Sequence, residues 1–97
     1  MAHHTVNITC DNAADPSCYE FDPQDLEVER EDTVSYTGEN ANIKFLATIA
    51  DPPGIKTGET TTIKENAPLG VFELDVEVHA CNRDCGGPGP PRIIIQA

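Results

Sequence analysis

The sequence has little of what nucleic-acid and membrane proteins need. Only six of its 97 residues are Lys or Arg, against seventeen Asp and Glu, and the formal net charge is −11. Binding to nucleic acid or to anionic lipid requires a concentrated positive surface. No apolar run approaches the roughly 20 residues of a membrane-spanning helix. We therefore expect no nucleic-acid partner and no membrane insertion, and a protein partner of basic character fits the charge better.

Aromatic residues are also scarce. Tryptophan is absent, and two Tyr and three Phe are the only aromatic side chains. A chain of 97 residues has the length of one ordinary domain, so we expect a single domain over residues 1–97 with a modest core. The missing tryptophan argues against an immunoglobulin domain, whose core packs a Trp against a Cys pair.

Most ordered-looking stretches alternate apolar and polar residues, which is typical of an antiparallel strand with one wet face. The clearest case is Val71–His79, where four apolar side chains alternate with Glu73, Asp75, Glu77 and His79. Long 3.6-residue periods are not found. The pattern predicts strands over Thr5–Cys10, Leu26–Glu31, Thr33–Thr37, Ile43–Ile49, Thr60–Lys64, Val71–His79 and Arg92–Ile95.

Turn-forming residues separate these segments, including Asp22-Pro23, Asp51-Pro52-Pro53-Gly54 and the Gly/Pro stretch 86–91. About seven short strands punctuated in this way indicate an all-β fold, a Greek-key β-sandwich. The acidic residues between Asp11 and Asp32 are interpreted as a solvated surface, with a docking surface for a basic partner or a calcium site as the alternatives.

The order of these features resembles the cupredoxin family, the plastocyanin-type copper-binding β-sandwiches. Phe21–Val28 is similar to the family's second strand, with an aromatic residue, a proline and then an apolar alternation. Glu31–Tyr36 resembles the "G-D-x-V-x-F" turn and strand, with Glu31 in place of Gly. Gly70-Val71-Phe72 is similar to the "G-T-Y" that opens the copper-cysteine strand. The resemblance implies a cupredoxin-like sandwich.

The ligand positions of the family are mostly filled by other residues. Its members bind copper through a His in an "H-N-V/I" stretch, a Cys-x-x-His pair and usually a Met. Ala41-Asn42-Ile43 matches the first stretch with Ala in place of His, and Val76 falls at the Cys position. His79 keeps the second His, and no Met lies near Asp84. The resemblance therefore predicts a non-enzymatic domain without a type 1 copper site or other cofactor, a binding or structural module of unknown ligand.

The alternative is a metal-binding protein that uses copper or zinc for electron transfer or metal handling. His79, Cys81 and Cys85 are its candidate ligands. The spacing Cys81-x₃-Cys85 suits a structural zinc site, whereas Cys10-x₇-Cys18 does not.

Disulfide formation is the other interpretation of the cysteines. Cys10, Cys18, Cys81 and Cys85 allow three pairings, and the sequence does not choose among them. The family resemblance would bring all four to one pole of the sandwich. Bridged cysteines would place the protein in the periplasm or outside the cell.

No catalytic motif is present, neither a phosphate-binding loop nor a G-x-S-x-G or H-E-x-x-H pattern, so we expect no enzyme. A shallow apolar patch at Ala41, Asn42 and Val78 is the predicted docking site, provided that Ala41, Val76 and His79 converge at one pole. His3 and His4 follow Met1-Ala2 and are interpreted as a cloning remnant or a disordered terminus.

Overall fold

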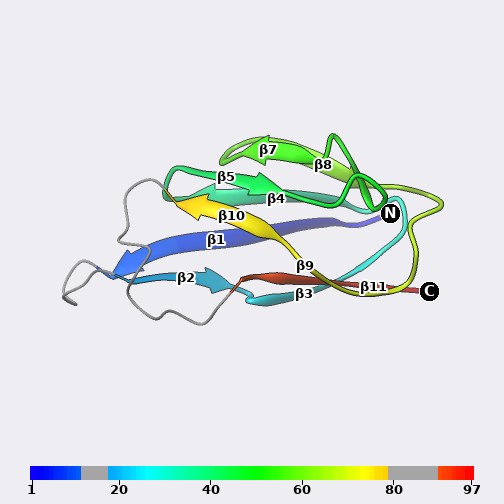
Figure 1. Ribbon diagram of the computed structural model, residues 1–97, viewed down its shortest axis with the longest axis horizontal. Coiled ribbons are helices and arrows are strands. Elements are labelled where there is room, and N and C mark those ends of the chain that lie inside the picture. The colour runs from blue at the N-terminus through cyan, green and yellow to red at the C-terminus, as the bar shows by residue number, and fades with distance from the viewer. Residues whose placement is uncertain (12–17, 79–89) are drawn as a thin grey trace.

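The computed structural model describes residues 1–11, 18–78 and 90–97, and every regular element in these ranges is a β-strand. One layer is a five-stranded sheet with the order β2–β1–β4–β8–β6. Its strands are β1 (His3–Asp11), β2 (Cys18–Asp22), β4 (Thr33–Gly38), β6 (Ala50–Asp51) and β8 (Thr60–Ile63). Figure 1 shows strands of the second layer, β5 and β10, passing in front of β4 and β1.

The second layer consists of two three-stranded sheets, ordered β3–β11–β9 and β10–β5–β7. Their strands are β3 (Asp25–Glu29), β5 (Ala41–Lys44), β7 (Gly54–Lys56), β9 (Gly70–Glu73), β10 (Asp75–Val78) and β11 (Arg92–Gln96). Only Leu74 separates β9 from β10, so one stretch of chain joins both sheets.

The change of partner at Leu74 has a local cause. Its amide donates to the carbonyl of Pro91 at 2.9 Å, which extends the β9–β11 ladder by one bond. Pro91 has no N–H to donate in return, and neither has Pro90 before it. The ladder with β11 therefore ends here, and the chain continues as β10 against β5.

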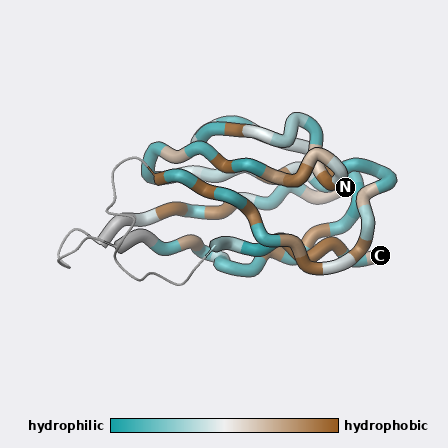
Figure 2. Tube along the Cα trace, in the orientation of Figure 1, coloured by the Kyte–Doolittle hydropathy of each residue, from teal (hydrophilic) through white to brown (hydrophobic). Residues whose placement is uncertain are grey.

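Alternate side chains from both layers fill one core, as the period-two pattern predicts. Tyr36 from the first layer packs edge-to-face on Phe45, with ring centroids 6.3 Å apart. Figure 2 shows the alternation of hydrophobic and hydrophilic residues along the strands. The buried strand residues of the core include Val6, Ile8, Val34, Ile63, Leu26, Val28, Ile43, Ile55, Val78, Ile93 and Ile95. No helix in the described ranges is long and apolar enough to cross a membrane.

The prediction of an all-β sandwich is confirmed, but several strand predictions need correction. The structure has eleven strands in its described ranges instead of about seven. Val71–His79 divides into β9 and β10, and β2, β6 and β7 were not predicted. The alternation favoured antiparallel pairing, but the structure also contains parallel pairs, between β1 and β4 and between β3 and β11.

Ile43–Ile49 is not one strand, because the chain turns after Phe45. The amides of Ile49 and Ala50 both donate to the carbonyl of Leu46, at 3.0 and 3.3 Å. These local hydrogen bonds take the place of strand-to-strand hydrogen bonds. Ala47 is therefore exposed, although the alternation over Ile43–Ile49 predicted it to be buried.

The turn between β3 and β4 contains an unfavourable backbone conformation. Glu31 has a φ of 72°, in the left-handed region that favours glycine. The family resemblance places Gly at this position. We expect Glu31→Gly to stabilise the fold by up to about 1 kcal/mol, measured as the free energy of unfolding in urea. Glu27→Gly, inside β3, is the control and should instead lose about 0.5–1 kcal/mol; a loss in both variants would contradict the prediction.

Candidate functional site

The pole predicted to hold the functional residues is formed by the start of β5 and the end of β10. Figure 1 places these strand ends at the same end of the molecule as the end of β1 and the start of β2. The antiparallel register sets Ala41 opposite Val78 and Ile43 opposite Val76. The structure therefore sets Ala41 beside Val78, whereas His79, which the docking prediction also requires at this pole, lies outside the described residues.

The side chains at this pole differ from the expected apolar patch. Ala41 and Val78 are only 3% and 2% exposed, so they belong to the core, and Asn42 alone of the three is exposed. The surface instead has a mainly polar hollow of about 460 Å³. Thr57 fixes its rim, because its hydroxyl accepts from the amide of Ala41 at 2.9 Å and donates to the carbonyl of Glu39 at 2.8 Å. The hollow is lined by Asn40, Ala41, Asn42, Lys56 and Thr57.

The described residues at the pole do not fit a type 1 copper ion. Such a site needs a thiolate and two imidazoles. Ala41 stands where the resemblance places the first His, and Val76, which packs against the core, stands where it places the Cys. Neither side chain has an atom that can bind a metal, and no group of three or more His, Cys, Asp or Glu side chains in the described ranges could hold one.

The remaining metal and disulfide candidates lie outside what the structure describes. His79, Cys81 and Cys85 belong to residues 79–89. Cys10 and Cys18 are in β1 and β2, where the register pairs Cys10 with Tyr19 and Cys18 with Asp11. Their side chains are not described. The disulfide and metal predictions for these residues stay predictions.

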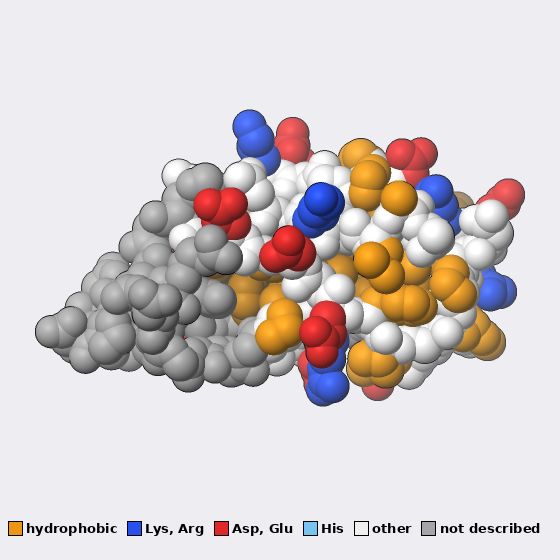
Figure 3. All heavy atoms as spheres, in the orientation of Figure 1, with side chains coloured by type: hydrophobic (Ala, Val, Ile, Leu, Met, Phe, Trp, Pro, Cys, Tyr) orange, Lys and Arg blue, Asp and Glu red, His pale blue; other side chains and the backbone are white. Residues whose placement is uncertain are grey.

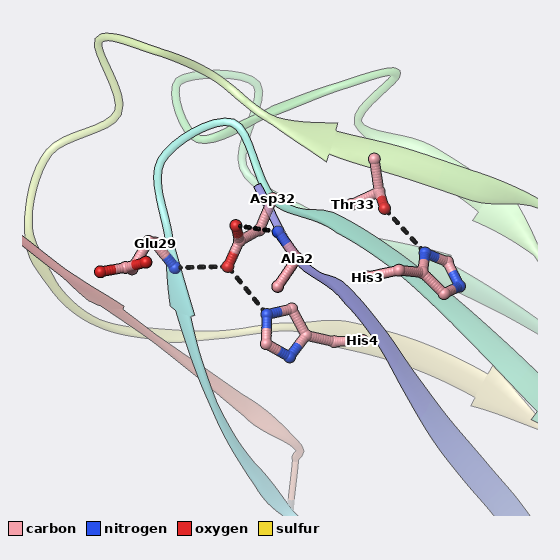
Figure 4. Close-up of polar contacts among 6 residues, drawn as sticks. All are labelled: Ala2, His3, His4, Glu29, Asp32 and Thr33. Atoms are coloured by element: carbon pink, nitrogen blue, oxygen red, sulfur yellow. Dashed lines mark hydrogen bonds and ion pairs between the residues drawn. The ribbon is translucent and has the colours of Figure 1, made fainter.

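The N-terminal residues are ordered, and they surround a buried carboxylate that sequence reasoning missed. Asp32, 2% exposed, accepts hydrogen bonds from the amides of Ala2 and Glu29 at 2.8 and 2.9 Å. His4 Nε2 lies 2.8 Å from Asp32 Oδ2, the oxygen that also accepts from the amide of Glu29 (Figure 4). Burial alone would raise the pKa of Asp32, but these bonds outweigh it and lower the pKa to about 2. The interpretation of His3 and His4 as a disordered terminus is therefore wrong.

His3 also makes the one contact of the described residues that resembles a nucleophile–base pair. Its Nε2 lies 3.2 Å from the hydroxyl of Ser35, which is largely buried, and its Nδ1 lies 2.7 Å from the hydroxyl of Thr33. In a hydrolytic triad the third group is a carboxylate that stabilises the imidazolium. A threonine hydroxyl carries no charge, so this arrangement does not reproduce a triad.

A second surface carries exposed apolar side chains on the outer face of the β3–β11–β9 sheet. Val71 is 56% exposed and stands opposite the half-buried Ile94. Glu27 stands on the other side of Ile94. The sequence offered a signal, because Val71 occupies the same side of the alternation as Glu73. Three consecutive isoleucines are typical of a strand that is covered on both faces, but Ile94 is only half-buried.

Comparison with known proteins gives a structural likeness alone. No family model matches the chain, and no curated protein matches it. Among solved structures, a pseudoazurin from a Sinorhizobium species superposes with a TM-score of 0.56 at 19% sequence identity. The match covers 100% of this chain and 76% of the pseudoazurin. The fold is cupredoxin-like.

The cupredoxin-like fold allows the residues at the pole to be compared with the ligand positions that the resemblance assigned. The residues that the resemblance assigned to the first two ligand positions do lie on neighbouring strands of the second layer, β5 and β10. Ile43, which follows Asn42, faces Val76 directly, whereas Ala41 faces Val78 two residues further on. The pole thus keeps the strand framework while its described inward side chains are aliphatic.

Proposed function

We propose that this protein is a non-enzymatic binding module, a cupredoxin-like sandwich without a type 1 copper site. The aliphatic side chains of Ala41 and Val76 carry the proposal, because they occupy the two positions that the resemblance assigns to an imidazole and a thiolate. Ala41 is buried in the core, and the partly buried Val76 packs against it.

Two further observations support a role in binding instead of catalysis. The His3–Ser35 contact has a hydroxyl, Thr33, in place of the carboxylate of a triad. Asp32, the carboxylate with the largest displacement of pKa, is buried and fully engaged by backbone amides and His4. A group held in this way stabilises the fold and does not exchange protons near neutral pH.

Copper titration tests this function directly. We expect Cu(II) added to the native protein to produce no intense visible absorption of the copper–thiolate type. The His79→Ala variant should give the same spectrum as the native protein. Native mass spectrometry after zinc addition covers the zinc alternative. An intense visible band in the native protein that His79→Ala abolishes would overturn the copper-free proposal. A stoichiometric zinc adduct would favour the metal-binding alternative.

The four cysteines are relevant to the cellular compartment in which the protein resides. Four cysteines in a domain of this size are consistent with an oxidising compartment, the periplasm or the extracellular space. We expect a thiol count in denaturant to find fewer than four reactive groups. Four reactive thiols in freshly prepared protein would contradict this localisation.

A further inference from the structure

The outer face of the β3–β11–β9 sheet has an apolar centre with carboxylates around it. The register aligns Glu27, Ile94 and Val71 in its central row. The next row aligns Asp25, Arg92 and Glu73. Val71 exposes more than half of its surface, on a strand face whose other positions are charged or polar. Leu69, 48% exposed, comes shortly before Val71 in the chain.

The charge of this face is negative. Its one cation, Arg92, is engaged by Asp25 through two hydrogen bonds of 2.9 and 2.7 Å. The hydrogen bond from Arg92 lowers the pKa of the Asp25 carboxyl. Glu27, at the end of the central row, and Glu73, in the next row, therefore set the sign of the potential near Val71. Figure 3 shows exposed hydrophobic side chains among Asp, Glu, Lys and Arg side chains on the face of the molecule toward the viewer.

We propose that this face, defined by Val71, Ile94, Glu27 and Glu73, docks a basic protein partner whose cationic side chains surround an apolar centre. The inference rests on the proposed function, since it names the partner of a binding module. An apolar contact contributes affinity, and the surrounding carboxylates steer a cationic partner toward it. A second copy of the chain is a poor occupant, because each copy carries a net charge of −11 and would present the same carboxylates.

A short peptide reproduces the chemistry of such a partner. The probe is KKLWLKK, acetylated and amidated at its ends. The control KKSWSKK keeps the charge and removes both leucines, and the control EELWLEE keeps the apolar centre and reverses the charge. Because the protein has no tryptophan, the tryptophan fluorescence of the peptide reports binding without a tryptophan signal from the protein. We expect KKLWLKK to bind about tenfold more tightly than either control, and to weaken as ionic strength rises.

Two variants and one matched control locate the contact. Val71→Thr keeps the branched shape of the side chain, and Glu27→Lys/Glu73→Lys reverses the charge beside it. Each is expected to weaken KKLWLKK binding about fivefold or more. Glu20→Lys/Asp51→Lys makes the same change in net charge at exposed positions of the five-stranded sheet, and should weaken binding less than twofold. Circular dichroism checks that all variants fold.

Backbone amide shifts in the native protein give a test that needs no variant. On addition of KKLWLKK, the shifts should concentrate in residues 69–73 and Arg92–Gln96. Shifts concentrated around Asn42 and Lys56, or equal weakening by both double variants, would overturn the proposed face. Equal affinity for KKLWLKK and KKSWSKK would mean that the peptide binds by general charge attraction, and this result would also overturn the proposed face. Copper titration is independent of every one of these results, so the two proposals fail separately.

Discussion

Gly38→Ala is expected to destabilise the protein by about 3 kcal/mol or more, since left-handed backbone strain and overpacking each cost about 1–3 kcal/mol. Gly38 ends β4 with a φ of 100°, and a Cβ added there would lie 2.1 Å from the carbonyl oxygen of Ile8. That oxygen belongs to the neighbouring strand β1 and accepts a hydrogen bond from Glu39 at 3.0 Å. The backbone around Gly38 must therefore shift to make room, which disturbs the parallel β1–β4 pairing.

Two other glycines separate the strain of the dihedral angle from the steric clash. Gly58 has a similar φ of 94°, but nothing lies within 4 Å of an added Cβ. Gly58→Ala should therefore lose only about 1 kcal/mol, from the dihedral angle alone. Gly54 has neither a positive φ nor a close neighbour, so Gly54→Ala should be nearly neutral. Urea unfolding of the three variants provides the measurement, and equal losses at Gly38 and Gly58 would contradict the clash with Ile8.

Asp32→Asn is expected to cost about 2 kcal/mol at pH 7, with the cost shrinking in acid. The folded-state pKa of about 2 lies below the ordinary value of 3.8, so ionised Asp32 stabilises the fold above about pH 4. This stabilisation is lost as the pH falls from about 4 to about 2. The amide of Asn also turns a donor toward Glu29 N or His4, where the carboxylate offers only acceptors.

Urea unfolding at pH 7 and at pH 2.5 tests this prediction. The native protein should lose stability between these two conditions by a larger amount than Asp32→Asn does. Asp51→Asn makes the same chemical change at an exposed position of β6 and should track the native protein. If Asp32→Asn were destabilised relative to the native protein by the same amount at pH 2.5 as at pH 7, the ionised carboxylate would not be the source of the effect.

Strand alternation predicted the sandwich because the burial of one face is a local property of the sequence. Phe72, Leu74, Val76 and Val78 do share the inward side, as their spacing predicted. Their change of sheet at Leu74 was not predictable in the same way. It depends on Pro91, a partner that lies far along the chain and that only the register identifies.

The role of Asp32 was hidden for a related reason. It stands in a run of carboxylates, and nothing local distinguishes the one that turns inward. Its partners Ala2 and His4 lie 30 and 28 positions away, so their proximity follows from the parallel β1–β4 pairing. The resemblance of Glu31–Tyr36 to the family turn did contain an Asp at this position, and that was the available signal.

The placement of β11 between β3 and β9 also constrains how the chain can fold during its synthesis. Translation delivers β3 and β9 well before Arg92–Gln96, the strand that both of them pair with. Until that strand has been made, each has an unpaired edge, and the apolar side chains of Leu26 and Val28 still lack their neighbours Ile93 and Ile95. Such partly formed sheets are the ones that aggregate or recruit chaperones. This half of the sandwich can therefore close only after residue 96 has been made.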